Sequence, residues 1–400
     1  MSSDLRGYLA ELFRKKELVV IKKKVSTKYE LAAITAAMDG SRAVLFEKVK
    51  ESKFQVVSNL VGTKERFAQA VRAPVHKIHD KVIWAIKHAS KPRIVVKGKF
   101  MENQSRNLFI LPIITHFEKE PGPFITSSII YTRNQEVGTQ NSSFHRLLRL
   151  DDRHFSVRMV EGRHLYRSYM YAKGHGEDLR VAITVGVHPA VSIAGAYQAE
   201  WGRDELEIAN ELLGRKLTLA MCPYSGMLVP SEAEIVMEGR ILKDKNHKEW
   251  MVEMLRTYDF KRMQPVFELD RMYYRNKPIF HDILSGYGEH RLLMGMPIEA
   301  KLNRNLKQVL PYVIVVDDDI DPSDPVAVEY AMATRFQADK DLVIMPKVRG
   351  SSLDPSSDQK NLLTTKMGVD ATKSFLKHVE GFEIAKIPRS GKVSIRSYLR

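Results

Sequence analysis

The side chains with the most useful chemistry lie in the middle of the chain, far apart in sequence. Asn141, His164 and Glu205 offer an amide oxygen, an imidazole and a carboxylate, a set of ligands suited to Mn²⁺ or Mg²⁺. Arg146 follows the first of them closely, and two glutamates four residues apart come much later. Residues with such wide spacing are more often unrelated core or surface positions, so the spacing alone establishes no site.

The first hundred residues alternate between helical and strand patterns. Apolar residues recur at helical spacing near the N-terminus, with Ser3 or Asp4 as a candidate N-cap. The expected elements are helices at 5–13, 31–38 and 77–89 and strands at 18–21 and 43–46. This alternation predicts an N-terminal α/β domain over residues 1–105.

Strand patterns dominate from about residue 107 onwards. The expected strands are 108–114, 124–131, 144–150, 155–160, 181–187, 217–221, 233–241 and 265–274, with one helix at 204–213. So many short strands predict a sheet or barrel over residues 106–300. Alternation returns over 301–400, with strands at 313–316 and 342–345 and a helix at 325–335. The whole chain is therefore expected to be a mixed α+β protein of three domains.

Composition and charge narrow the class of protein. The chain has 400 residues, of which 44% are hydrophobic and 28% charged, as in ordinary globular proteins. Its longest apolar runs have the length of a strand, so no membrane span is expected. The single cysteine, Cys222, excludes an internal disulfide and a cysteine metal cluster. No signal-peptide pattern is present, so the expected location is the cytoplasm.

The net charge of +15 suits either nucleic acid or a small anionic substrate. The basic residues are spread along the chain and form no recognisable nucleic-acid-binding motif, so no nucleic-acid partner is expected.

Several co-linear segments resemble one protein family. The segment Asn141-Ser142-Ser143-Phe144-His145-Arg146 is similar to the Asn-x-x-x-x-Arg strand of the UbiD family of decarboxylases. Further segments that resemble family motifs are 158–160, 163–164, 204–206, 230–239, 276–281, 315–321, 353–355 and 366–372. The resemblance covers nearly the whole chain and is weakest before about residue 100. It implies that residues 106–300 form a split β-barrel that binds a flavin.

The cofactor implied by this resemblance is prenylated FMN, with Mn²⁺ (or Mg²⁺) and with K⁺ as a further ion. Asn141, His164 and Glu205 would bind the metal beside the cofactor phosphate. The resemblance places the cofactor against Phe144, His145, Arg146, Arg158, Met159, Val160, Arg163 and His164. His145 could touch the flavin, but a packing role is favoured, because its side chain would point to the opposite face of the strand from Arg146.

The resemblance also implies catalytic roles for Arg146, Glu249 and Glu253. Arg146 would hold the substrate carboxylate through two hydrogen bonds, and Glu249 would orient Arg146. Glu253 would protonate the carbon that loses CO₂, which requires a pKa raised towards neutrality. The family usually places its two acids five residues apart around a Gly-Pro, whereas here they are four apart and the Gly-Pro is missing. Asp259 is the alternative acid, although its register indicates a structural role.

The short length of the chain and its sequence at residues 257–259 and 262–266 resemble archaeal family members. That likeness predicts decarboxylation of trans-anhydromevalonate 5-phosphate to isopentenyl phosphate in the mevalonate pathway of isoprenoid biosynthesis. Aromatic substrates such as 4-hydroxybenzoate or a 3-polyprenyl-4-hydroxybenzoate of quinone biosynthesis remain open, as does a catalytically inactive flavin-binding protein. The implied partners are an unsaturated carboxylate substrate, a UbiX-type flavin prenyltransferase that supplies the cofactor, and further copies of the chain in a homodimer or larger homo-oligomer. A C-terminal tail would help these copies associate.

Overall fold

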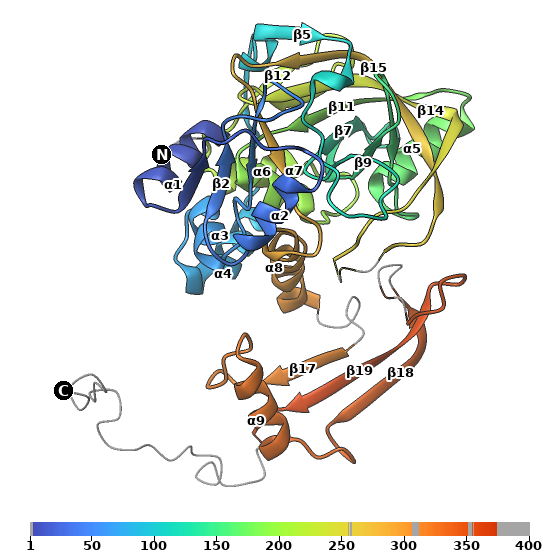
Figure 1. Cartoon of the computed structure of the whole chain (residues 1–400). Helices are drawn as coiled ribbons and strands as arrows, with labels where there is room; N and C mark the ends of the chain where they lie inside the picture. Colours follow the sequence, from blue (N-terminus) through green and yellow to red (C-terminus); the bar gives the residue numbers. More distant parts are fainter. Residues whose placement is uncertain are drawn as a thin grey trace, which may run out of the picture. The chain divides into compact units, whose positions relative to one another are not determined.

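The computed structural model describes residues 3–254, 256, 258–305, 312–350, 354 and 356–373. It confirms the expected mixed α+β fold. The chain divides into two compact units, Met1–Arg304 and Asn305–Arg400, which are described separately (Figure 1). The three expected domain boundaries stay a prediction, and the expected association tail lies mostly outside the described residues.

The N-terminal part of the first unit pairs helices with a small sheet. Its helices are α1 (Leu5–Arg14), α2 (Glu30–Ala37), α3 (Lys64–Val71) and α4 (Ile78–Lys87). Its sheet has the order β1 (Leu18–Ile21), β2 (Ala43–Phe46), β3 (Gln55–Ser58) and β16 (Ile279–Asp282). Helix α1 starts where the sequence indicates, because the Asp4 side chain accepts a hydrogen bond from the Gly7 N–H. Strand β16 therefore brings residues from late in the chain back to this sheet.

A nine-stranded, mainly antiparallel sheet dominates the first unit. Its path runs through β6 (Phe124–Ile125), β9 (Leu147–Arg149), β10 (His154–Val157), β15 (Arg262–Tyr274), β14 (Ile235–Glu249), β11 (Leu179–Val185), β7 (Ile129–Arg133) and β8 (Gln140–Phe144), and β5 (Asn103–Ser105) pairs with β15. The long strands β14 and β15 shift register at two places, next to Gly239 and after Ile241. Such irregularities increase the local bend and twist, so the sheet curls rather than lying flat.

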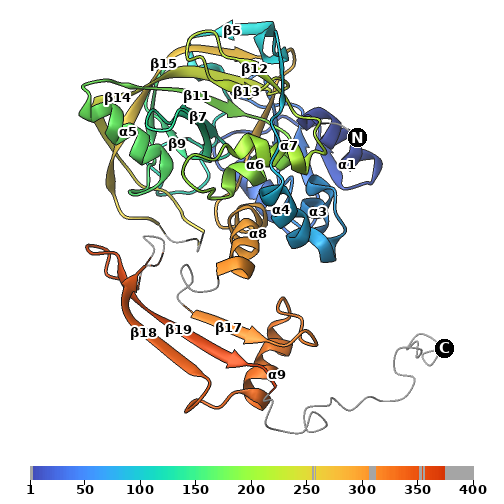
Figure 2. The same ribbon diagram turned by 180° about the vertical axis from the view of Figure 1, so that it is seen from behind.

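Two short helices fill the space beside this sheet. Helices α6 (Pro189–Ala196) and α7 (Glu205–Leu212) contact strand β8 on one side and the helices α3 and α4 on the other. Figure 2 shows these four helices from behind. The remaining elements of the unit are α5 (His164–Gly174), α8 (Gly288–Asn305), and a three-stranded sheet of β4 (Arg93–Val95), β12 (Thr218–Met221) and β13 (Leu228–Pro230). Apolar residues from both sides of the large sheet form two buried clusters, so the sheet has a core on each face.

The second unit has a three-stranded sheet in the order β17 (Tyr312–Val316), β19 (Leu363–Ala371) and β18 (Leu342–Arg349). Helix α9 (Pro325–Arg335) packs on it through Ala331 and neighbouring apolar residues. Arg335 pairs with Asp317 and Asp319, which explains the acidic run after β17 as a structural ion cluster. Among the described residues of the whole chain, no helix combines the length and apolar character needed to cross a membrane.

The structure corrects several expected elements. Residues 108–114 were expected as a strand, but Leu108–Ile110 form a 3₁₀ turn because the Asn107 side chain accepts from the Phe109 N–H. The expected strands 124–131 and 144–150 are each split in two. Residues 158–160 follow β10 rather than continuing it, and His164 begins a helix. The helices α3, α5, α6 and α8 were not expected.

Candidate functional site

The structure brings Asn141, His164 and Glu205 together from three elements. Asn141 lies in β8, and the other two are the first residues of α5 and α7. The Asn141 Nδ2 is 3.0 and 3.2 Å from the two Glu205 oxygens and 3.4 Å from His164 Nδ1. The Asp204 side chain caps α7, which fixes the position of the following glutamate.

Glu205 is a buried carboxyl group, and burial disfavours its ionised form. It is 2% exposed and accepts a hydrogen bond from the Ser142 N–H at 2.7 Å. Burial raises the pKa of Glu205 to about 8, although the hydrogen bond from Ser142 opposes the shift. A divalent cation would stabilise this carboxylate, with the imidazole of His164 and the amide oxygen of Asn141 as further ligands. The donor set therefore fits Mn²⁺ or Mg²⁺.

The amide is essential to that fit. Within the part of the chain that the structure describes, no three His, Cys, Asp or Glu side chains gather as a metal site. The cluster around Glu205 supplies only two of these residue types, so the third ligand would be the Asn141 oxygen. In the structure the amide presents its nitrogen to Glu205, and a half-turn about its last bond would present the oxygen instead.

A second cluster is centred on Arg146, in the short connection between β8 and β9. Its Nε and Nη2 donate to the two oxygens of Glu249 at 3.2 and 3.0 Å. Nη2 also donates to Asp259 at 3.1 Å, and Nη1 donates to Glu253. Burial alone lowers the pKa of Arg146, but the carboxylates of Glu249 and Glu253 outweigh it and raise that pKa overall. The guanidinium is therefore held charged and in a fixed orientation.

The acids reach Arg146 because the chain between β14 and β15 folds back on itself. Glu249 ends β14, and the Asp259 N–H donates to the Met251 carbonyl at 2.8 Å. This contact brings Asp259 beside Glu249, although ten residues separate them in sequence. Asp259 also lies 3.6 Å from Arg158 and 3.5 Å from Arg262. Sequence reasoning gave Asp259 a structural role and missed its contact with Arg146; the only signal was its place as the next acid.

The residues expected to contact a flavin surround these two clusters in different ways. Met159 is buried, and its N–H donates to Gln264 at 2.8 Å. Arg158 points to Asp259 and to the Met159 carbonyl. The residues Phe144 and His145 are partly buried, whereas Val160 and Arg163 are exposed. No measured contact assigns them to a flavin, so their binding roles remain predictions.

His290 is a further histidine close to this cluster. It is in the first turn of α8, and its Nδ1 accepts from the Gly286 N–H at 3.0 Å. Burial lowers the pKa of His290, and the charges of Glu253 and Arg146 act on it in opposite directions. The Arg256 Nε also donates to the Gly286 carbonyl oxygen at 3.1 Å, so the loop at Gly286 lies beside the segment that carries Glu253.

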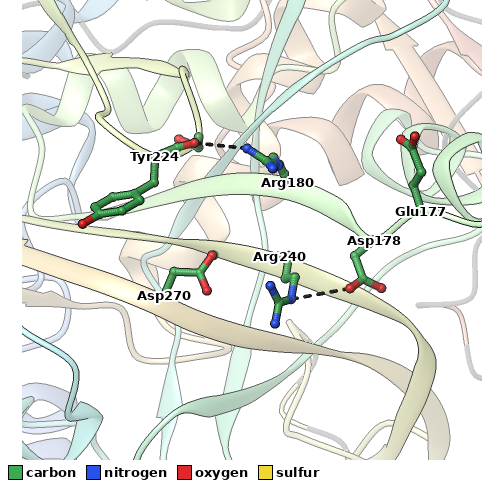
Figure 3. Close-up of a pocket in the computed structure, with 8 residues that line it drawn as sticks. Glu177, Asp178, Arg180, Tyr224, Arg240 and Asp270 are labelled. Atoms are coloured by element: carbon green, nitrogen blue, oxygen red, sulfur yellow. Dashed lines mark hydrogen bonds and ion pairs between the residues drawn. The ribbon is translucent and has the colours of Figure 1, made fainter.

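A hollow on the surface of the described residues lies elsewhere. It has a volume of about 480 Å³ and is lined from β11, β14, β15 and the turn at Tyr224 (Figure 3). None of the residues lining it belongs to the two clusters above. Its charges are largely paired, since Arg240 contacts Asp178 at 3.5 Å and Glu268 at 2.7 Å. It therefore carries no assigned role.

Family models match almost the whole described chain. The N-terminal, Rift-related and C-terminal domains of 3-octaprenyl-4-hydroxybenzoate carboxy-lyase match residues 9–86, 87–288 and 293–371.

Two similar proteins are anhydromevalonate phosphate decarboxylases of archaea. The protein of Methanocaldococcus jannaschii is 35% identical, over 95% of this chain and all of its own. The protein of Methanothermobacter thermautotrophicus is 34% identical, over 89% of this chain and 94% of its own. A similar solved structure is the UbiD-class enzyme HmfF from Pelotomaculum thermopropionicum in complex with FMN. It is 32% identical over 99% of this chain and 100% of its own, with a TM-score of 0.93.

Proposed function

Because the chain belongs to the UbiD family of carboxy-lyases, we propose that it catalyses the non-oxidative decarboxylation of trans-anhydromevalonate 5-phosphate to isopentenyl phosphate and CO₂ with prenylated FMN. The observation that supports this best is the placement of Arg146 among three acids, Glu249, Glu253 and Asp259, next to the strand that carries Asn141. Such an arrangement can bind a carboxylate and deliver a proton at one place.

The cofactor, when bound, supplies an electron sink for the carbon that loses CO₂. The protein's own contribution begins with Arg146. Its Nε–Nη2 edge is occupied by Glu249, so a substrate carboxylate would approach the Nη1 side, where Glu253 lies. Glu249 and Asp259 would hold the guanidinium in place while the substrate carboxylate replaces Glu253 at Nη1. Glu253 would therefore have to move away from Nη1 before Arg146 could donate two hydrogen bonds to the substrate carboxylate.

Glu253 is the better placed of the acids to transfer a proton. Its side chain is 18% exposed, and its one ion pair within the described residues is with Arg146. Asp259 is 3% exposed and lies within 3.6 Å of three arginines. Asp259 is therefore committed to three ion pairs, whereas Glu253 makes one, so Asp259 would orient Arg146 and Glu253 would donate the proton to the product carbon.

The metal would be Mn²⁺ or Mg²⁺, bound by Asn141, His164 and Glu205. The N-termini of α5 and α7 meet at this cluster, because His164 and Glu205 are their first residues. Backbone N–H groups at helix N-termini favour anions, which suits the cofactor phosphate beside the cation. A K⁺ ion would be a further occupant of the same region.

The substrate assignment follows the archaeal relatives and the charge of the chain. Both relatives above carry the name anhydromevalonate phosphate decarboxylase, and the net charge of +15 favours a phosphorylated substrate. The cofactor would come from a UbiX-type flavin prenyltransferase. We also propose that the chain assembles as a homodimer or larger oligomer in the cytoplasm; a relative is named as an evolved dimeric form of HmfF with prFMN.

The function is tested with protein co-expressed with the flavin prenyltransferase. We expect it to convert trans-anhydromevalonate 5-phosphate to isopentenyl phosphate, measured by mass spectrometry of the product. The same preparation is offered 4-hydroxybenzoate as a control. Turnover of the hydroxybenzoate without isopentenyl phosphate would replace the proposal by an aromatic decarboxylase. Turnover of neither, with cofactor bound, would support an inactive flavin-binding protein.

A further inference from the structure

A chain of hydrogen bonds runs from Asn141 towards the Arg146 cluster. Asn141 and Ser143 are two residues apart in β8 and therefore share one side of the strand, and His145 follows directly after the strand ends. The Ser143 Oγ lies 3.3 Å from Asn141 Oδ1 and 2.9 Å from His145 Nε2. His145 Nδ1 lies 2.8 Å from the carbonyl oxygen of Arg158.

The direction of these bonds is fixed from the far end. A carbonyl oxygen only accepts, so His145 Nδ1 carries a hydrogen and donates to Arg158. Loss of water around the ring lowers the pKa of His145 to about 4, so at neutral pH the ring has no second hydrogen. Nε2 must then accept, and among the described residues the donor in contact with it is the hydroxyl of Ser143.

That assignment leaves Ser143 with no hydrogen for Asn141. A hydroxyl has one hydrogen, and here it points to His145. With Oδ1 facing Ser143, two oxygen lone pairs meet at 3.3 Å. A half-turn of the amide removes this conflict, because Nδ2 then donates to the Ser143 Oγ. The same half-turn directs Oδ1 at Glu205.

An amide oxygen directed at a carboxylate is repelled unless a cation lies between them. In the structure Nδ2 lies 3.0 and 3.2 Å from the two Glu205 oxygens and can donate to both of them. To bind a cation, Asn141 must present Oδ1 instead. The hydrogen bond from Nδ2 to the Ser143 Oγ then compensates for the lost contacts between Nδ2 and Glu205. We propose that Ser143 and His145 are positioning residues that hold the Asn141 amide with its oxygen towards the metal.

This inference rests on the proposed metal site, not on the reaction. Partners that orient a metal ligand commonly change metal affinity by roughly 10- to 100-fold when removed. Ser143→Ala is therefore expected to weaken Mn²⁺ binding by roughly 10- to 100-fold. Ser143→Thr keeps the hydroxyl and should bind Mn²⁺ like wild type. Ser143→Cys, a weak donor of similar size, should be intermediate.

The measurement is calorimetric titration of Mn²⁺ into flavin-loaded protein from which a chelator has removed the metal. A background of Asn141→Asp separates orientation from structural damage, because a carboxylate has no nitrogen to misplace. In that background Ser143→Ala should change the Mn²⁺ affinity by less than about two-fold. An equal loss in both backgrounds, or an unchanged affinity in Ser143→Ala alone, would overturn the proposal, as would wild-type protein that binds no Mn²⁺. Decarboxylation is measured in a separate assay. A protein that lacks activity can therefore be distinguished from one in which Ser143 and His145 do not orient the Asn141 amide.

Discussion

Replacing Arg146 by lysine is expected to lower kcat/KM for decarboxylation by roughly 10²- to 10⁴-fold. Lysine keeps the charge but cannot make the paired hydrogen bonds to Glu249 or reach Asp259 at the same time. Breaking a buried ion cluster costs about 3–5 kcal/mol, and each ~1.4 kcal/mol corresponds to a tenfold change in rate. The measurement is CO₂ release by cofactor-loaded protein at several substrate concentrations.

Arg262→Lys is the matched control for this variant. Arg262 also contacts Asp259, at 3.5 Å, but its side chain is 26% exposed. We expect its rate to stay within about tenfold of wild type, because lysine keeps the positive charge and solvent partly screens the ion pair of this partly exposed residue. If Arg146→Lys kept the wild-type rate, Arg146 would not be the group that binds the substrate carboxylate.

Glu253→Gln should lower kcat by about 10²- to 10⁴-fold with little change in KM, the range typical of a lost proton donor. Glutamine has nearly the same shape and can still accept a hydrogen bond from Arg146, but it has no acidic proton to deliver. The measurements are kcat, KM and the uptake of solvent deuterium into the product.

Asp259→Asn is the comparison that identifies the donor. It removes a buried acid from the same guanidinium, so we expect it to weaken the positioning of Arg146 and to destabilise the fold. A titrating donor makes kcat depend on pH, and this dependence should disappear in Glu253→Gln and persist in Asp259→Asn. The opposite pattern would transfer the role of proton donor to Asp259.

Local sequence signals predicted part of the regular elements. The strands β1 and β2 and the helix α9 have the expected bounds, because each has a clear apolar pattern. Helix α6 was missed because it is apolar and buried nearly all round, so it shows no amphipathic period. The strand expected at 108–114 was wrong because one asparagine side chain bends the chain at its start.

The site depended on information that local patterns do not contain. Asn141 and Glu205 are 64 residues apart, and only the packing of α7 against β8 brings them together. Motif resemblance suggested that pairing, and the geometry is consistent with it. Asp259 shows the limit of this reasoning, since the missing Gly-Pro obscured the register and only the folded connection reveals its contact with Arg146.

The central claim is that one protein molecule holds prenylated FMN and one divalent ion at the cluster of Asn141, His164 and Glu205. Native mass spectrometry of the protein co-expressed with the flavin prenyltransferase tests it in one spectrum. We expect the chain to carry FMN enlarged by one isoprenoid unit together with one Mn²⁺ or Mg²⁺, and Glu205→Gln to lose the metal mass. A wild-type chain that carries no flavin, or a Glu205→Gln chain that retains the metal, would contradict the account.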